Sequence, residues 1–136
     1  MRNRQKRTRG GAMMELVLIG PWIFFLSIGA LDWGFYATAL VSVEAAARSA
    51  ALYTSTGSST AGDTTNARII AVGEMQNLPN VSDTNPVVTA TAVSGPDSAP
   101  ASKVSVSYQS ITLIPIPGVL ARQLGINRTV TLRLRT

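Results

Sequence analysis

The chain has 136 residues, a net charge of +5, and neither cysteine nor histidine, so it has room for one small domain beyond a membrane anchor. The missing residue types exclude the commonest general base, the usual zinc ligands and every Ser-His or Cys-His pair. No motif of paired carboxylates or of the Ser-Lys type is visible. We therefore expect no enzyme, and no catalytic, cofactor-binding or metal-binding residue.

The positive charge is concentrated at the N-terminus. Five cations lie within the first nine residues, namely Arg2, Arg4, Lys6, Arg7 and Arg9. From Gly10 onward seven cations are balanced by seven acids, so the sequence predicts no basic domain face and no nucleic-acid partner. A basic run directly before an apolar segment is typical of a topological signal. Residues 1–10 are therefore predicted to form a basic leader in the cytoplasm, with the C-terminal domain on the other side of the membrane.

An apolar run follows the leader. Residues 16–31 are uncharged, and Glu15 is the one charged residue between Gly11 and Leu31. A helix needs about 20 residues to cross the hydrocarbon core of a bilayer, so this run is long enough for one span. Pro21 lies within it, and membrane helices tolerate such a proline.

Asp32 and Trp33 are predicted to mark the outer membrane boundary. Asp32 follows Glu15 by 17 residues, which corresponds to roughly 25 Å of helix against a bilayer core of about 30 Å. Trp33 and Trp22 lie toward opposite ends of the run, where aromatic side chains favour the interface. The alternative role for Asp32 is pairing with a cation of an assembly partner.

The helix is predicted to continue beyond the membrane to about residue 53. Residues 35–53 contain neither Pro nor Gly and are rich in Ala, the best helix former. The Ala residues either reflect helix propensity alone or form a packing surface for other subunits. Of the 13 residues from Thr54 to Asn66, 12 are Ser, Thr, Gly, Asp or Asn, which is typical of an exposed loop.

A short second helix is predicted after this loop. Asn66 can cap a helix that runs from Ala67 to about Leu78 and is closed by Pro79. Its predicted apolar band consists of Ile69, Ile70, Met75 and Leu78.

Alternation with period two predicts three strands, around residues 88–92, 103–109 and 129–135. Such strands form a sheet with one buried and one wet face. Residues 111–118 contain Pro115 and Pro117 and cannot form a central strand, and a helical turn is predicted near residues 119–124. The predicted fold is α+β: a transmembrane and extended helix over residues 11–53, a polar loop over 54–66, and a small domain over 67–136 with a short helix and a roughly three-stranded antiparallel sheet.

Glu15 places a carboxylate inside the apolar run, where a charge makes membrane insertion less favourable. An acid costs roughly 2–3 kcal/mol near the centre of a membrane helix and less near the interface, where it could simply reach toward water. Glu15 lies four residues after Gly11. Cleavage between Gly10 and Gly11 would make it the fifth residue of the mature chain, about one helical turn from the new α-amino group. The amine of one subunit could then pair with the carboxylate of another.

This arrangement resembles the class III leader and N-terminal helix of type IV pilin-like proteins. The longer resemblance is to the TadE-like minor pilins, or pseudopilins, of tight-adherence (Flp pilus) systems. The stretches that carry it are Arg9-Gly10-Gly11-Ala12-Met13-Met14-Glu15, Pro21, Gly29-Ala30-Leu31-Asp32-Trp33-Gly34, the Ala-rich residues 44–51, Val104-Ser105-Val106-Ser107-Tyr108 and Ile114-Pro115-Ile116-Pro117-Gly118. One departure is Leu16, where many family members have Phe after the glutamate.

The resemblance implies a structural or assembly subunit of a Flp-type pilus. Gly10 and Gly11 would be the processing residues for a prepilin peptidase, and Glu15 the assembly residue. The other implied partners are pilin-like subunits, an inner-membrane assembly platform and membrane lipid. The chain would stay in the inner membrane or be extracted from it into a surface pilus.

Three alternatives remain open. Ala37-Thr38-Ala39 has the form of an ordinary signal-peptidase site, which would make the chain secreted, although Asp32, Trp33 and Tyr36 approach that site poorly. A membrane-anchored enzyme or binding domain unrelated to pili is the second. The third is a major pilin, but major Flp pilins are much shorter.

Overall fold

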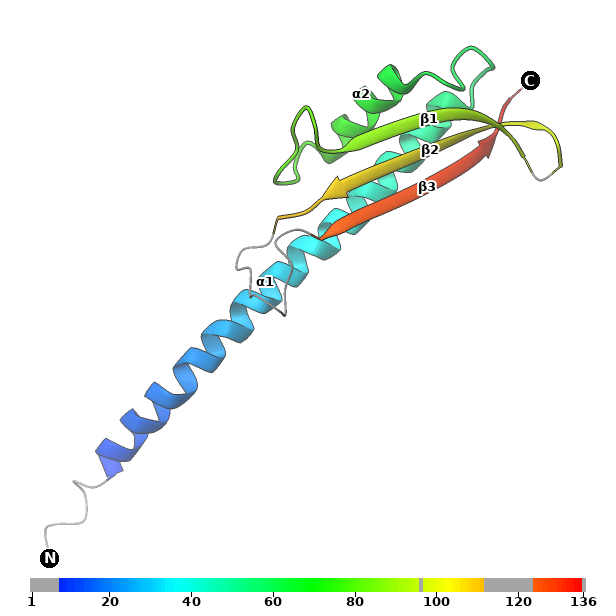
Figure 1. Cartoon of the computed structure of the whole chain (residues 1–136). Helices are drawn as coiled ribbons and strands as arrows, with labels where there is room; N and C mark the ends of the chain where they lie inside the picture. The colour runs from blue at the N-terminus through cyan, green and yellow to red at the C-terminus, as the bar shows by residue number, and fades with distance from the viewer. Residues whose placement is uncertain (1–7, 96, 112–123, 136) are drawn as a thin grey trace, which may run out of the picture. The chain divides into compact units, whose positions relative to one another are not determined.

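The computed structural model describes residues 8–95, 97–111 and 124–135. Its helices are α1 (Thr8–Thr54) and α2 (Thr64–Met75), and its strands are β1 (Val87–Ser94), β2 (Pro100–Gln109) and β3 (Gly125–Arg133) (Figure 1). The predicted α+β class, with a long apolar N-terminal helix, a short helix and a three-stranded antiparallel sheet, is confirmed. Most of the predicted leader, Pro115, Pro117 and most of the predicted turn at 119–124 lie outside the described residues.

The chain divides into two compact units, residues 1–34 and 35–136, and α1 contributes to both. In the described part of the first unit, α1 is helical from Thr8 onward, with Pro21 inside it. The hydroxyl of Ser27 donates to the carbonyl of Ile23 at 2.8 Å, so this polar side chain is satisfied within the helix.

In the second unit, the three strands form an antiparallel sheet in the order β1-β2-β3. The C-terminal part of α1 runs behind this sheet (Figure 1). Six α1 residues face it and are almost completely buried: Ala39, Val43, Ala46, Ala47, Ala50 and Ala51. Their spacing of three and four residues places them on one helical stripe. Small side chains let the helix lie close to the strands, whose Val104, Val106 and Tyr108 join the same core.

This packing resolves the two readings of the Ala-rich segment. Its buried alanines contact the chain's own sheet, so they are not free to pack against another subunit. The surface of this part of α1 that stays exposed includes Val41, Leu52 and the ion pair between Glu44 and Arg48.

The second helix differs from the prediction at both ends. It begins at Thr64 and ends at Met75, and Asp63 rather than Asn66 caps it, accepting the backbone N–H of Asn66 at 3.1 Å. The predicted apolar band is wrong for Ile69, which is 65% exposed, whereas Met75 is fully buried and Leu78 packs partly against the core. The buried residues of α2 are Ala67, Ala71 and Met75.

The predicted exposed loop is partly buried. Thr54, Ser55 and Ala61 are almost inaccessible to solvent. The hydroxyl of Ser102 in β2 lies 2.8 Å from the hydroxyl of Thr54 and 2.9 Å from the carbonyl oxygen of Ala61, so it ties both residues to the sheet with its one proton shared between them. In the sheet, β3 begins at Gly125, four residues before the predicted alternation. The strand is extended there by pairing with β2 rather than by a hydrophobic pattern.

Candidate membrane-spanning and assembly segment

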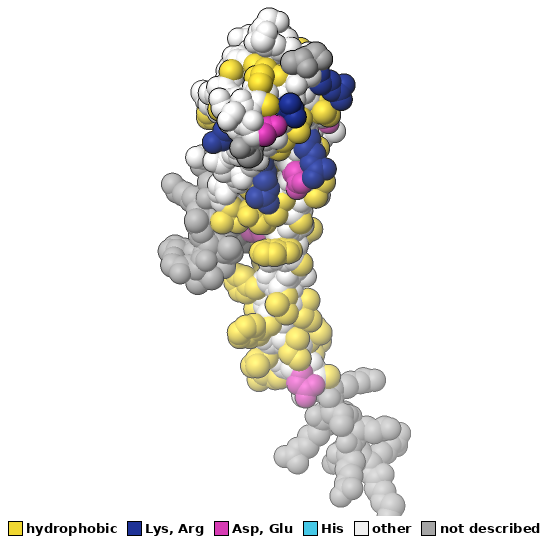
Figure 2. All heavy atoms as spheres, turned by 90° about the vertical axis from the view of Figure 1, so that its right-hand side faces the viewer, with side chains coloured by type: hydrophobic (Ala, Val, Ile, Leu, Met, Phe, Trp, Pro, Cys, Tyr) yellow, Lys and Arg dark blue, Asp and Glu magenta, His cyan; other side chains and the backbone are white. Residues whose placement is uncertain are grey.

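The described part of the first unit carries a continuous apolar surface. Between Gly11 and Asp32, twelve large apolar side chains of α1 are more than half exposed to solvent: Met13, Met14, Leu16, Val17, Leu18, Ile19, Trp22, Ile23, Phe24, Phe25, Leu26 and Leu31. Figure 2 shows hydrophobic side chains gathered along this helix. Transfer of one such side chain from water to an apolar environment is favourable by about 1.5–3 kcal/mol. This surface is therefore suited to contact with lipid or with other apolar helices.

α1 is long and apolar enough to cross a membrane, and it is the one such helix within the described ranges. Its apolar window is not covered by any described part of the chain. This distinguishes it from the core helix of a soluble domain, whose apolar stripe is buried.

Gly10, Gly11 and Glu15 all lie in the first turns of this helix. Gly11 and Glu15 are four residues apart, which places them on one face of the helix, one turn from each other. Both are exposed. A Cβ atom added at Gly11 would meet no other atom within 4 Å, so packing does not require glycine at this position.

Asp32 and Trp33 lie further along the same helix. The side chain of Asp32 is partly buried, whereas that of Trp33 is 71% exposed. Trp22 is exposed to a similar degree, at 70%. Neighbouring leucines of α1 are exposed to the same degree, so the membrane boundary at Asp32 and Trp33 stays a prediction.

The C-terminal domain carries few clustered titratable groups within the residues that the structure describes. Among the described residues, no group of three or more Asp, Glu, His or Cys side chains could hold a metal ion. The clearest pair of titratable groups is Tyr53 and Asp63, whose hydroxyl and carboxylate lie 3.1 Å apart. Hydrogen bonds from the side chain and backbone of Asn66 lower the pKa of Asp63. Burial and the neighbouring Asp63 raise the pKa of Tyr53. Asp63 thereby links the end of α1 to the start of α2 through its contacts with Tyr53 and Asn66.

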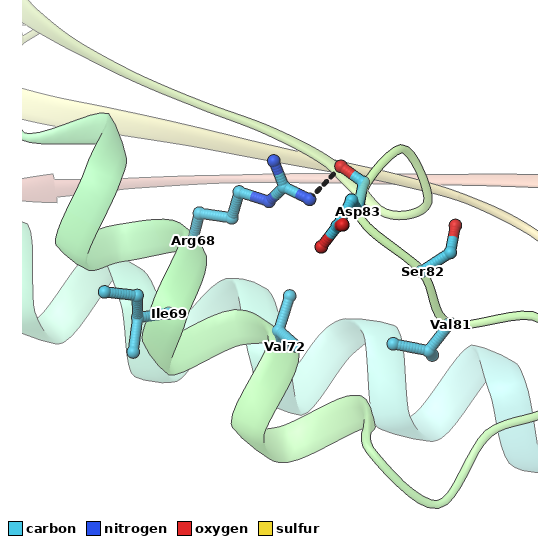
Figure 3. A pocket seen from close by; sticks show the side chains of 6 residues that line it. All are labelled: Arg68, Ile69, Val72, Val81, Ser82 and Asp83. Atoms are coloured by element: carbon cyan, nitrogen blue, oxygen red, sulfur yellow. Dashed lines mark hydrogen bonds between the residues drawn. The ribbon is translucent and has the colours of Figure 1, made fainter.

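A groove of about 400 Å³ lies beside α2. Its apolar lining comes from Ile69 and Val72 of α2 and from Val81 in the segment that follows. Figure 3 shows the guanidinium of Arg68 donating to the backbone carbonyl of Asp83. The groove is shallow and largely apolar, and its one described cation is occupied with this backbone contact. It therefore has the character of a packing surface rather than of a catalytic pocket.

The sequence reasoning missed two polar clusters of the domain. The first is the contact of Ser102 with Thr54 and Ala61. The second is a network in which the side-chain amides of Asn80 and Asn85 donate to the carbonyl of Gln109 at 2.9 and 3.0 Å. Neither has a local sequence signal, because the partners are at least 24 residues apart. The cap at Asp63 did have one, since Asp is among the strongest capping residues.

No family model, no curated protein and no solved structure matches this chain.

Proposed function

We propose that the chain is a pilin-like structural or assembly subunit, a minor pilin or pseudopilin of a tight-adherence type IV-like pilus. One observation carries the proposal. A carboxylate, Glu15, lies one turn after Gly11 on a helix whose apolar side chains are exposed along the whole stretch to Leu31. The sequence resemblance around Gly10, Gly11 and Glu15 gives this combination its pilus-specific meaning.

The proposed sequence of events begins in the inner membrane. The basic leader stays in the cytoplasm, α1 spans the bilayer, and the C-terminal domain lies outside. A prepilin peptidase hydrolyses the peptide bond between Gly10 and Gly11, leaving a carboxylate on the leader and an α-amino group on Gly11. The subunit then joins other pilin-like subunits at an inner-membrane assembly platform.

Glu15 supplies the electrostatic element of that assembly. A single carboxylate in lipid is disfavoured, and the new amine of Gly11 is disfavoured for the same reason. Pairing the carboxylate of one subunit with the amine of a neighbour offsets both charges. The open space around Gly11 leaves this amine accessible to a second helix.

The test is the mature N-terminus, measured by mass spectrometry of the protein from piliated cells. We expect the wild-type chain to begin at Gly11. Gly10→Leu should leave full-length precursor in the membrane, because the peptidase requires a small residue before the cleaved bond. Gly20→Leu is the matched control, since it makes the same glycine-to-leucine change at an exposed position of α1 where an added Cβ would meet no atom within 4 Å, and it should be processed normally.

Other N-termini would identify the rival functions. A chain that begins at Leu40 is a secreted domain cut by signal peptidase after Ala39. A chain that retains Met1 in piliated cells is an unprocessed anchor, which favours a membrane-anchored binding domain. Either result removes the pilus assignment.

A further inference from the structure

The two edge strands of the sheet differ in how far other parts of the chain cover them. β1 and β3 are the edge strands, and α2 packs beside β1 (Figure 1). The hydroxyl of Thr64, the first residue of α2, lies 3.3 Å from both the backbone nitrogen and the carbonyl oxygen of Ala90. It thereby satisfies both outward-pointing groups of that residue. The edge of β1 is thus partly closed by the chain itself.

The pairing of β2 with β3 shows which backbone groups of β3 point outward. Leu134 donates its N–H to Pro100, and Ser110 donates its N–H to Leu124, both at 3.0 Å. Even-numbered residues of β3 therefore bond to β2. In an antiparallel pair the intervening residues point the other way, so the N–H and C=O groups of Asn127, Thr129, Thr131 and Arg133 point outward.

Within the described residues, no other strand pairs with these outward N–H and C=O groups of β3. The side chains of the four residues that carry these groups are exposed, and β2 is the one described element with extensive contacts to β3. Just after β3, the backbone N–H of Arg135 donates a hydrogen bond to the carbonyl of Ser55 at 2.9 Å, so the described chain covers the edge at that end. An open edge of this kind is a template for another strand.

The inner face of β3 is also incompletely covered. Val130 and Leu132 are half-buried, whereas Val104 and Val106 of the central strand are fully buried. An additional strand beside β3 would cover these two side chains if its own inward residues were apolar. The occupant should therefore alternate apolar residues with polar ones.

The charges at this edge decide which kind of strand fits. Arg128, Arg133 and Arg135 are exposed cations on or just after β3, and Lys103 lies opposite Thr131 on β2. Asp97 is the described acid that pairs with one of them, Arg133, at 3.2 Å. Arg133 lies on the exposed face of the sheet with Thr131 and Lys103, whereas Arg128 alternates to the face of Val130. Pairing β3 with β3 of a second copy would bring the cations of the exposed faces of both chains to one seam, and like charges across a sheet are destabilising. A strand that carries carboxylates is favoured instead.

We propose that the outer edge of β3, residues 127–133, binds an extended segment of a partner protein as a fourth strand, and that this segment alternates apolar and acidic residues. The proposal rests on the sheet of the C-terminal domain and not on the pilus assignment. Failure at β3 would leave the processing at Gly10 untouched, and the reverse also holds.

The test uses the full-length chain in detergent micelles and a fluorescent peptide of about ten residues, a normal strand length, in which Val alternates with Glu and Thr. We expect saturable binding above that to empty micelles, and slower hydrogen exchange of the amides of Thr129 and Thr131. The same peptide with Lys in place of Glu should bind at least about tenfold more weakly, a difference of about 1.4 kcal/mol.

Thr131→Pro separates the edge from the fold. It removes an outward N–H and places a ring at the edge, but leaves the ladder to β2 intact. Peptide affinity should fall about tenfold or more, since a backbone hydrogen bond and close approach are both lost. Ala92→Pro is the matched control, because Ala92 is exposed and its N–H points outward from the opposite edge. Its affinity should equal that of the wild type.

A second variant reverses charge on exposed side chains and leaves the backbone of β3 unchanged. Arg133→Glu combined with Arg135→Glu, which changes the two exposed cations at the end of β3, should reverse the preference, so that the Lys peptide binds more tightly than the Glu peptide. The proposal is overturned if wild-type protein shows no saturable binding of the Glu peptide, or if its Thr129 and Thr131 amides are already protected without peptide. It is also overturned if the charge-reversed protein keeps the wild-type preference, or if the peptide-free chain pairs β3 with β3 of a second copy.

Discussion

Ser102 shows how strongly one side chain can order a segment of low apolar content. Its hydroxyl is completely buried and contacts both Thr54, at the end of α1, and Ala61, in the loop that follows. A buried hydroxyl without a partner costs roughly 1–3 kcal/mol, so this contact favours one position of the loop over many. A run of Ser, Thr and Gly is thereby held against the sheet.

Glu15 is the residue on which the proposed assembly depends most. Glu15→Gln keeps the size and hydrogen-bonding capacity of the side chain but removes its charge, and Glu15→Leu removes both. Both variants should insert as well as the wild type or better, because the span becomes more apolar. Recovery of other pilin-like subunits by co-purification should fall about tenfold, equivalent to about 1.4 kcal/mol of lost pairing, and pili per cell should fall with it.

The domain provides the control for this experiment. Its sheet and α2 belong to the second unit of the chain, so hydrogen exchange of β2 amides should be unchanged in both Glu15 variants. Equal piliation and equal partner recovery for Glu15→Leu and the wild type would mean that the acid has no role in assembly.

The start of α2 depends on Asp63, whose carboxylate accepts hydrogen bonds from the backbone of Asn66 at 3.1 Å and from its side chain at 2.7 Å. These bonds hold the pKa of Asp63 below its ordinary value. A carboxyl group with a lowered pKa stabilises the folded state above its unfolded pKa of about 3.9. This contribution is lost as the pH falls through the lower pKa of the folded state.

The domain of the wild type should therefore lose stability, relative to Asp63→Asn, as the pH falls below about 4. Asn is also a good capping residue but does not titrate, so the variant isolates the charge. Denaturant unfolding of both proteins between pH 7 and pH 2.5 measures the difference. Asp63→Ala should be less stable than both at neutral pH. A difference between wild type and Asp63→Asn that does not change with pH would contradict this assignment.

The proposed orientation of the chain in the membrane rests on the charge of its leader. All five leader cations precede the apolar run, and cations are retained on the cytoplasmic side. A reporter fused after Thr136 that is active only outside the cytoplasm should therefore be active, and a reporter active only in the cytoplasm should be silent at the same position. Replacing the five leader cations with Gln should reduce the difference between the two reporters. The opposite pattern in the wild type would reverse the topology.

Much of the fold follows from patterns that are local in the sequence. The apolar run from Leu16 to Leu31 and the absence of Pro and Gly after Phe35 predict α1, because hydrophobicity and helix propensity act over a few turns. Alternation with period two locates β1, β2 and most of β3 for a similar reason, since one face of the sheet must be buried. The candidate residues Gly10, Gly11 and Glu15 were found in the same way, from their spacing along one helix.

The remaining features depend on contacts between distant residues. Ile69 fits an apolar band on α2 as well as Ala67 does, but the face of α2 that packs on the core carries Ala67, Ala71 and Met75, so Ala67 is buried and Ile69 is exposed. The burial of Thr54 requires Ser102, 48 residues later. The difference between the closed edge at Ala90 and the open edge at Thr131 depends on where α2 packs. Local spacing determines which segments become helix or strand, whereas which faces and edges are covered is determined by the packing of segments that no local pattern relates.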